Sequence, residues 1–232
     1  MTTSSARGII FNLNRDLYLK DPQNSSYGQK LLQNSVELIE KMGIECFTFK
    51  KLATAISSTE ASVYRYFENK HKLLLYLTCW YWEWVHYLID LNIRNIEDPQ
   101  KVLKITIHHI INASTESPLT SYINERLLHN VVIKEGTKAY HIHDVDDENQ
   151  SGFYSSYKGV VSKVASIIKN YDASFPYPKM LASNLCEMAN NQIFFAEHIP
   201  QLTDIANRKK KYEDLEEALT LMVFRILEAT KN

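Results

Sequence analysis

An apolar stripe between residues 73 and 91 constrains the fold of this sequence more than any other feature. Its members recur every three or four residues, the spacing of one helix face, and they are Leu73, Leu77, Trp80, Trp84, Leu88 and Leu91. No segment of the chain alternates apolar and polar residues as a half-buried strand does. The stripe predicts a long helix, capped by Asn69 and reaching Ile93 or beyond, in an all-α protein.

The same spacing recurs along the rest of the chain, with capping residues where helices should begin. Thr48, Thr59 and Asp98 suit the N-cap because their side chains accept hydrogen bonds from the first amides of a helix. Gly43 suits the left-handed position that ends one. Further helices are predicted over residues 25–42, 48–56, 59–67, 99–116, 119–134, 153–175, 179–198 and 212–229. An N-terminal arm is expected over residues 1–24, and a polar surface loop over 135–152.

The net charge limits how this chain could hold a nucleic acid. At a formal charge of -1 over 232 residues it cannot do so by bulk positive charge, so any DNA contact needs a local basic surface. Residues 27–75 contain seven Lys and Arg against five Glu, a local excess of +2 that permits such a contact. Hydrophobic (45%) and charged (23%) contents are those of a globular chain.

Cys46, Cys79 and Cys186 are scattered, without the spacing of a zinc site or a disulfide framework. We therefore expect reduced thiols, and neither a metal nor a cofactor. The N-terminal residues lack the features of a signal peptide. No apolar run approaches the roughly 20 residues that span a bilayer. These features predict a soluble, cytoplasmic protein that has no membrane partner.

Residues 48–67 predict two short helices joined by the tight connection Ser57-Ser58. Their inward faces are apolar, and the residues on them are Phe49, Leu52, Ala53, Ile56, Val63 and Phe67. The second helix offers polar and small residues on its outward face, which are Glu60, Ala61, Ser62, Tyr64 and Arg65. A helix of this size fits the major groove of DNA and reaches base edges with its exposed N-terminal side chains. The pattern is typical of a helix-turn-helix DNA-binding unit.

Residues 52–74 resemble the signature of the TetR family of repressors. They read Leu52-Ala53-x-x-Ile56-Ser57-Ser58-Thr59-x-x-Ser62-Val63-Tyr64-Arg65-Tyr66-Phe67-x-x-Lys70-x-x-Leu73-Leu74. The resemblance implies an all-α homodimer that binds a palindromic operator in double-stranded DNA. It implies a tri-helical helix-turn-helix domain over residues 25–74. The long helix would join this domain to a helical bundle over residues 75–232, which binds a small-molecule effector and dimerises.

The resemblance also assigns roles by position. Phosphate contacts fall on Thr48, Tyr64, Tyr66 and Lys70. Base-facing positions fall on Lys50, Glu60, Ala61 and Ser62, with Arg65 between the two classes.

Two features depart from the family pattern. The family usually has Gly-Val in the turn where this chain has Ser57-Ser58, so a positive φ at Ser57 would strain the turn slightly. Glu60 places a negative charge on the groove-facing helix. It could accept from a cytosine amino group, or exclude wrong sites by phosphate repulsion.

An effector pocket and a dimer interface are predicted after the long helix begins. The pocket candidates are Trp80, Trp84, Tyr87, Tyr122, His129 and Tyr157, and the alternative for the aromatic stripe is core packing between the two halves. The last two helices would dimerise through Leu181, Leu185, Met188, Phe195, Leu219, Met222 and Ile226. The leading hypothesis is a repressor, not an enzyme, that leaves its operator when the effector binds.

Two other functions fit the sequence. His141, His143 and Asp144 could serve a metal-dependent enzyme, although they lie in a polar stretch with no rigid element to hold them. A C-terminal domain with a filled core would instead give a DNA-binding protein of the same fold that has no effector.

Overall fold

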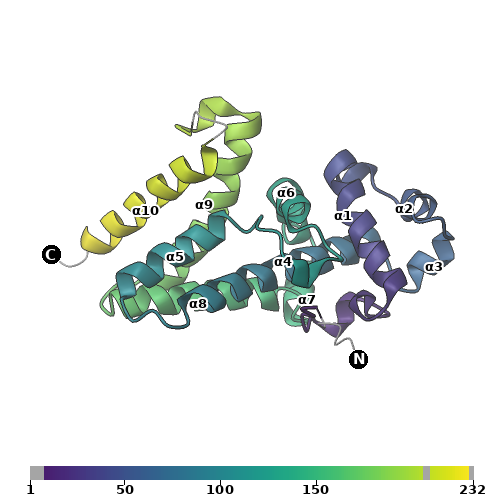
Figure 1. Cartoon of the computed structure of the whole chain (residues 1–232), viewed down its shortest axis with the longest axis horizontal. Helices are drawn as coiled ribbons and strands as arrows, with labels where there is room; N and C mark the ends of the chain where they lie inside the picture. Colours follow the sequence, from purple (N-terminus) through teal and green to yellow (C-terminus); the bar gives the residue numbers. More distant parts are fainter. Residues whose placement is uncertain (1–7, 206–209, 230–232) are drawn as a thin grey trace, which may run out of the picture. The chain divides into compact units, whose positions relative to one another are not determined.

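The computed structural model describes residues 8–205 and 210–229, and within these ranges every regular element is helical (Figure 1). The α-helices are α1 (Ser26–Cys46), α2 (Phe49–Ala55), α3 (Glu60–Tyr64), α4 (Lys70–Ile93), α5 (Pro99–Ile111), α6 (Glu125–Glu135), α7 (Val145–Gln150), α8 (Ser155–Tyr171), α9 (Pro178–His198) and α10 (Lys211–Ala229). Short 3₁₀ turns are η1 (Arg15–Leu17), η2 (Pro22–Asn24), η3 (Pro118–Thr120), η4 (Gly136–Ala139) and η5 (Pro200–Leu202). The predicted all-α fold is confirmed.

The chain divides into two compact units. The N-terminal unit comprises Met1–Tyr81 with Ser114–Ser156, and the C-terminal unit comprises Trp82–Ala113 with Tyr157–Asn232. The N-terminal unit therefore contains α1, α2, α3, α6 and α7, and the C-terminal unit contains α5, α9, α10 and most of α8. Helix α4 has residues in both, because the division falls between Tyr81 and Trp82.

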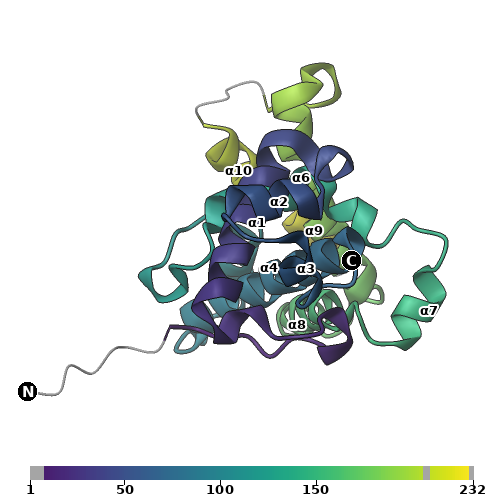
Figure 2. The same ribbon diagram turned by 90° about the vertical axis from the view of Figure 1, so that its right-hand side faces the viewer.

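Helix α1 begins where the sequence predicts and is interrupted at the predicted Gly43, but it continues to Cys46. Ser25 Oγ accepts a hydrogen bond from the Gly28 amide at 3.1 Å and caps the first turn. Leu32, Val36 and Ile39, which share one face of the helix, are buried. Gly43 takes the left-handed φ of 74° that interrupts the helix. Helices α1, α2 and α3 lie together in the N-terminal unit (Figure 2).

Helix α4 is a core helix that is apolar on several sides. Asn69 Oδ1 accepts a hydrogen bond from the Lys72 amide at 2.9 Å, which confirms Asn69 as the cap. The predicted stripe is buried from Leu73 to Leu88, but Leu91 is 48% exposed. Trp82 and Val85, which lie off the stripe, are buried as well. Within the described ranges no helix, α4 included, is long and apolar enough to cross a membrane.

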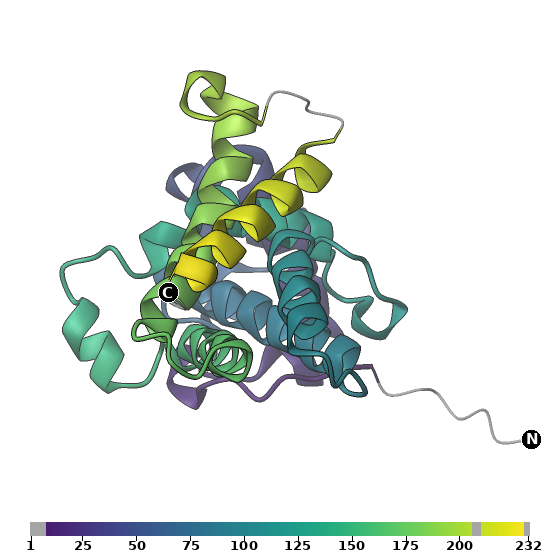
Figure 3. The same cartoon turned by 90° about the vertical axis from the view of Figure 1, so that its left-hand side faces the viewer.

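In the C-terminal unit, α10 packs along α9 and α5 (Figure 3). Its inward face repeats every three or four residues and consists of Leu215, Leu219, Val223, Phe224 and Leu227. Helix α5 starts with the predicted Asp98 cap, whose carboxylate accepts from the Gln100 amide at 2.9 Å.

Several predicted segments differ from the structure. The helices predicted over residues 99–116 and 153–175 are shorter, and end at Ile111 and Tyr171. The helix predicted over residues 119–134 starts only at Glu125, because Asn124 caps it there by accepting from the Leu127 amide at 2.8 Å. The loop predicted over residues 135–152 contains η4 and α7. Acidic residues in the first turn of α7 favour the positive end of the helix dipole. One of them, Glu148, also lies 2.8 Å from His71 Nε2 on α4.

Candidate nucleic-acid interface

The two short helices of the predicted motif are α2 and α3, and each begins at a capping threonine. Thr48 Oγ1 accepts from the Lys51 amide at 3.2 Å, and Thr59 Oγ1 accepts from the Ser62 amide at 3.3 Å. The predicted inward positions Phe49, Leu52, Ala53, Ile56, Val63 and Phe67 are all buried. This shared core fixes the outward face of α3.

The turn between α2 and α3 has the hydrogen bonds of a Schellman motif. The Ser58 amide donates to Ala53 O at 2.8 Å, and the Ser57 amide donates to Thr54 O at 3.2 Å. Ser57 has a φ of 55°, so a residue with a Cβ occupies the left-handed position that glycine usually takes. Ser57 therefore has the positive φ that was expected to strain the turn slightly.

Replacing Ser57 by glycine is expected to raise the free energy of unfolding by about 0.5–1 kcal/mol, because glycine adopts a positive φ without steric cost. Ser58→Gly is the matched control, since Ser58 lies outside the left-handed region and its hydroxyl pairs with Tyr27 Oη at 2.9 Å. That variant should be less stable than the wild type. Urea unfolding measures both, and equal stabilities would contradict the assignment of strain to Ser57.

The outward face of the motif carries exposed cations. Lys50 on α2 and Arg65 just after α3 are exposed, as is the predicted base-facing Ala61. Tyr64 is 45% exposed and its ring meets Phe49 edge-on at 5.0 Å, which orients it. Thr48 is also exposed, whereas Glu60 and Ser62 are half-buried. Lys50, Arg65 and Tyr64 thus give the motif exposed groups of the kinds that contact DNA phosphates.

Tyr66 and Lys70 do not present free polar groups there. Tyr66 is 4% exposed, and its hydroxyl pairs with Ser25 Oγ at 3.0 Å. Lys70 is half-buried, and its ammonium donates to the carbonyls of Ile44 (2.9 Å) and Glu45 (3.1 Å) at the end of α1. Tyr66 packs within the motif, and its predicted phosphate contact stays a prediction. Lys70 joins α4 to the end of α1.

The N-terminal arm packs within the N-terminal unit, which its sequence pattern did not predict. Over the described residues from Gly8 onward, Leu13 and Leu17 are buried, and the Leu19 amide donates to Tyr66 O at 2.8 Å. Gln23 exchanges two hydrogen bonds with the Phe11 backbone, at 3.0 and 2.8 Å. The spacing of Leu13 and Leu17 was the available signal, although it is too short to predict a packed segment alone. Residues 1–7 lie outside the described ranges.

Comparison with known proteins agrees with this geometry. Residues 31–77, which span α1 to the first turns of α4, match the family model of bacterial regulatory proteins of the tetR family. Residues 31–77 are therefore similar to the N-terminal part of tetR-family regulators. A search by sequence finds no match among curated proteins.

Solved structures extend the likeness to the rest of the fold. AibR in complex with isovaleryl coenzyme A and operator DNA is 14% identical, with a TM-score of 0.57 over 84% of this chain and 97% of that one. The fatty acid degradation regulator FadR from Bacillus halodurans is 15% identical, with a TM-score of 0.58 over 84% and 96%. The superantigen PfiT is 14% identical, with a TM-score of 0.59 over 88% and 97%. At such identities the likeness shows the fold alone.

The six predicted pocket residues divide between the two units. In the N-terminal unit, Trp80 Nε1 donates to Tyr122 Oη at 3.3 Å, and His129 Nδ1 lies 2.9 Å from Tyr81 Oη. Burial raises the pKa of Tyr122 to about 12, so its hydroxyl stays protonated beside Ile9 O, 2.9 Å away.

The other three candidates pack in the C-terminal unit. Trp84 stacks on Tyr87 with ring centres 5.6 Å apart and donates to Ala113 O at 3.1 Å. Tyr157 stacks on Trp82 at 4.6 Å. Core packing, the alternative interpretation, therefore describes Trp80, Trp84, Tyr122 and His129, all of which are buried. That a subset lines an effector pocket stays a prediction.

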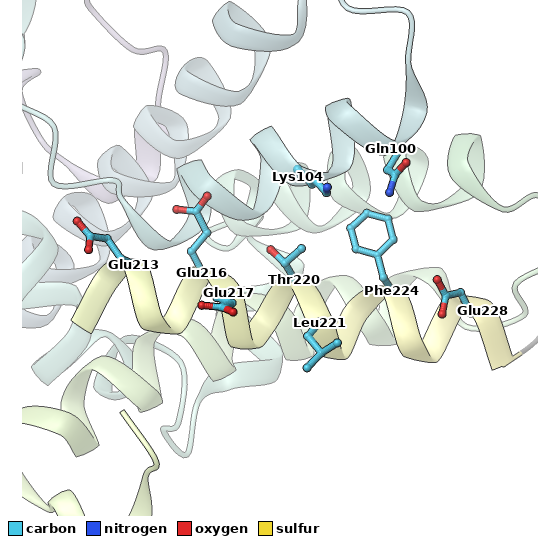
Figure 4. A pocket seen from close by; sticks show the side chains of 9 residues that line it. All are labelled: Gln100, Lys104, Glu213, Glu216, Glu217, Thr220, Leu221, Phe224 and Glu228. Atoms are coloured by element: carbon cyan, nitrogen blue, oxygen red, sulfur yellow. The ribbon is translucent and has the colours of Figure 1, made fainter. Parts of the chain in front are cut away.

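A groove of about 700 Å³ lies between α5 and α10 in the C-terminal unit (Figure 4). Helix α10 lines it with carboxylates and apolar groups, which are Glu213, Glu216, Glu217, Leu221, Phe224 and Glu228, and α5 adds Gln100 and Lys104. The pocket candidates predicted from the sequence do not line this groove. Glu216 is paired with His108 at 2.8 Å.

Only some of the residues predicted for the dimer interface are exposed in the structure. Leu181, Leu185 and Leu219 are buried within the chain, so they belong to its core. Met188 and Phe195 are half-buried. On α10, Leu221, Met222 and Ile226 are 58%, 50% and 43% exposed and face away from its inward side. These three form an exposed apolar patch on α10.

The metal interpretation receives no support from the part of the chain that the structure describes. There, no three His, Cys, Asp or Glu side chains come together as ligands for a metal ion. His141 instead meets the Tyr140 ring edge-on at 5.2 Å.

Proposed function

We propose that this protein is a transcriptional repressor that binds a palindromic operator as a homodimer and leaves it when a small molecule binds. The observation that carries the proposal is the exposed, positively charged face of α2 and α3, with Lys50, Tyr64 and Arg65 projecting from a motif whose core is fully buried. The recognition unit is residues 25–74, and residues 75–232 bind the effector and dimerise.

The exposed apolar patch on α10 supports self-association, because burying Leu221, Met222 and Ile226 against a second copy would remove apolar surface from water. A two-fold dimer presents two recognition helices about 34 Å apart, one DNA turn, and so requires a palindromic site. AibR, which shares the fold, is described in complex with both isovaleryl coenzyme A and operator DNA.

Selection of binding sites from random duplex DNA with the purified full chain tests the proposal. We expect a palindrome with half-sites one helical turn apart, and a complex with two protomers per duplex by light scattering. Recovery of no preferred sequence would overturn the proposal. The selected duplex then serves in a screen for small molecules that release the protein. Failure of every ligand class to do so would favour a DNA-binding protein without an effector.

A further inference from the structure

The end of the N-terminal arm lies directly beside the recognition helix. The Leu19 amide donates to Tyr66 O at 2.8 Å, and Tyr66 is two residues beyond the last residue of α3. Lys20 Nζ lies 5.1 Å from the centre of the Tyr66 ring. A backbone hydrogen bond and a cation–π contact therefore hold an arm lysine at Tyr66, the residue that follows the exposed Arg65 at the end of α3.

Lys20 occupies the surface above a tyrosine whose hydroxyl is already engaged. Tyr66 is buried, its hydroxyl pairs with Ser25 Oγ at 3.0 Å, and its ring stacks on Tyr27 with centres 5.5 Å apart. Lys20 itself is exposed. The outermost polar group at this point of the motif is thus an ammonium from the arm and not the phenol of Tyr66.

The neighbouring acid does not cancel this charge by direct pairing. Asp21 follows Lys20, but Oδ1 accepts from the Gln23 amide at 2.9 Å and Oδ2 from Asn24 Nδ2 at 2.7 Å. Its carboxylate is therefore committed to capping η2. Lys20 keeps a flexible stem that can carry its ammonium from the ring face to an anion nearby.

We propose that Lys20 contacts a DNA phosphate. It would supply the phosphate contact for which the Tyr66 hydroxyl, paired with Ser25 Oγ, is not free. The proposal rests on the DNA-binding function above, and it makes the arm part of the DNA-binding surface. A phosphate oxygen is the partner that this chemistry favours, because an exposed ammonium beside the recognition helix attracts the backbone regardless of base sequence.

The test is Lys20→Gln in the full chain, with affinity for the selected operator duplex measured over a range of salt concentrations. We expect affinity to fall about tenfold at low salt, and the slope of log K against log salt to decrease by about 1 per protomer. Lys20→Arg should retain both values. Tyr66→Phe should retain the slope, because the lost hydroxyl faces Ser25. Lys101→Gln, the same charge change on an exposed residue of α5, is the matched control and should leave the slope unchanged.

The outcomes separate this proposal from the one on which it rests. Wild-type protein that binds no duplex overturns both. Wild-type protein that binds, together with an unchanged slope in Lys20→Gln, overturns only the role of Lys20. A reduced slope in Tyr66→Phe instead would return the phosphate contact to the tyrosine. The slope is the decisive reading because it does not depend on the fraction of folded protein.

Discussion

Replacing Gly28 by alanine is expected to lower the free energy of unfolding by about 3 kcal/mol, the upper end of the usual cost of overpacking. A Cβ at this position would lie 2.3 Å from Pro22 O and 2.5 Å from Pro22 Cα. Both are backbone atoms, so no change of rotamer relieves the clash and either α1 or η2 has to move. Gly28 is the residue that lets the end of the arm cross the first turn of α1.

Thermal and urea unfolding of the full chain measure this effect, and Gly159→Ala is the matched control. Gly159 lies within α8, and a Cβ there would meet no atom within 4 Å. The control should be stabilised by about 0.5–1 kcal/mol, because alanine is the better helix former. Equal responses of the two variants would show that η2 yields freely, which would contradict the close packing of the arm.

Reversing the charges of Lys50 and Arg65 together, by Lys50→Glu and Arg65→Glu, is expected to weaken operator binding on the order of 1,000-fold or more. Both residues are exposed on the outward face of the motif, so the variant should melt at about the wild-type temperature. A dimer would place all four reversed charges against phosphates or base edges, where repulsion replaces attraction. The measurement is affinity for the selected duplex at fixed salt.

The control for the charge reversal is Lys101→Glu with Lys179→Glu, which changes the net charge equally on exposed residues of the C-terminal unit. This variant should bind with an affinity within a few-fold of the wild type, because screening limits the reach of distant exposed charges. If both double variants bind alike, the α2–α3 face is not the DNA-binding surface.

The sequence alone determined the local features of the fold. Asn69 caps α4, Asp98 caps α5, and Gly43 ends the regular part of α1. The inward face of the helix-turn-helix was also predicted correctly. Each of these depends on hydrogen bonds and φ angles within one turn, or on the periodicity of one helix. The residues concerned therefore carry the whole signal.

Tertiary structure decided which apolar face packs inside the chain. Helix α10 has two overlapping apolar stripes, one with Leu219 and Val223 and one with Met222 and Ile226. Periodicity shows that both exist, but only the packing against α9 and α5 buries the first and exposes the second. The aromatic pocket candidates divided between two units for the same reason. Sequence spacing shows which residues share one face of a helix, but it does not show which other helix packs against that face.

Helix α4, which the apolar stripe predicted, shows the same division between what the sequence and the tertiary structure determine. Its cap, its length and most of its buried stripe follow from residues 69–93 alone, because helical geometry repeats every 3.6 residues. Leu91 is exposed because no neighbouring element covers it, which the stripe could not reveal. At the proposed DNA-binding surface, the motif itself predicts Lys50 and Arg65 on the outward face, and both are exposed. The fold of a distant arm then covered Tyr66 and placed Lys20 above it, since burial depends on what the rest of the chain brings to a side chain.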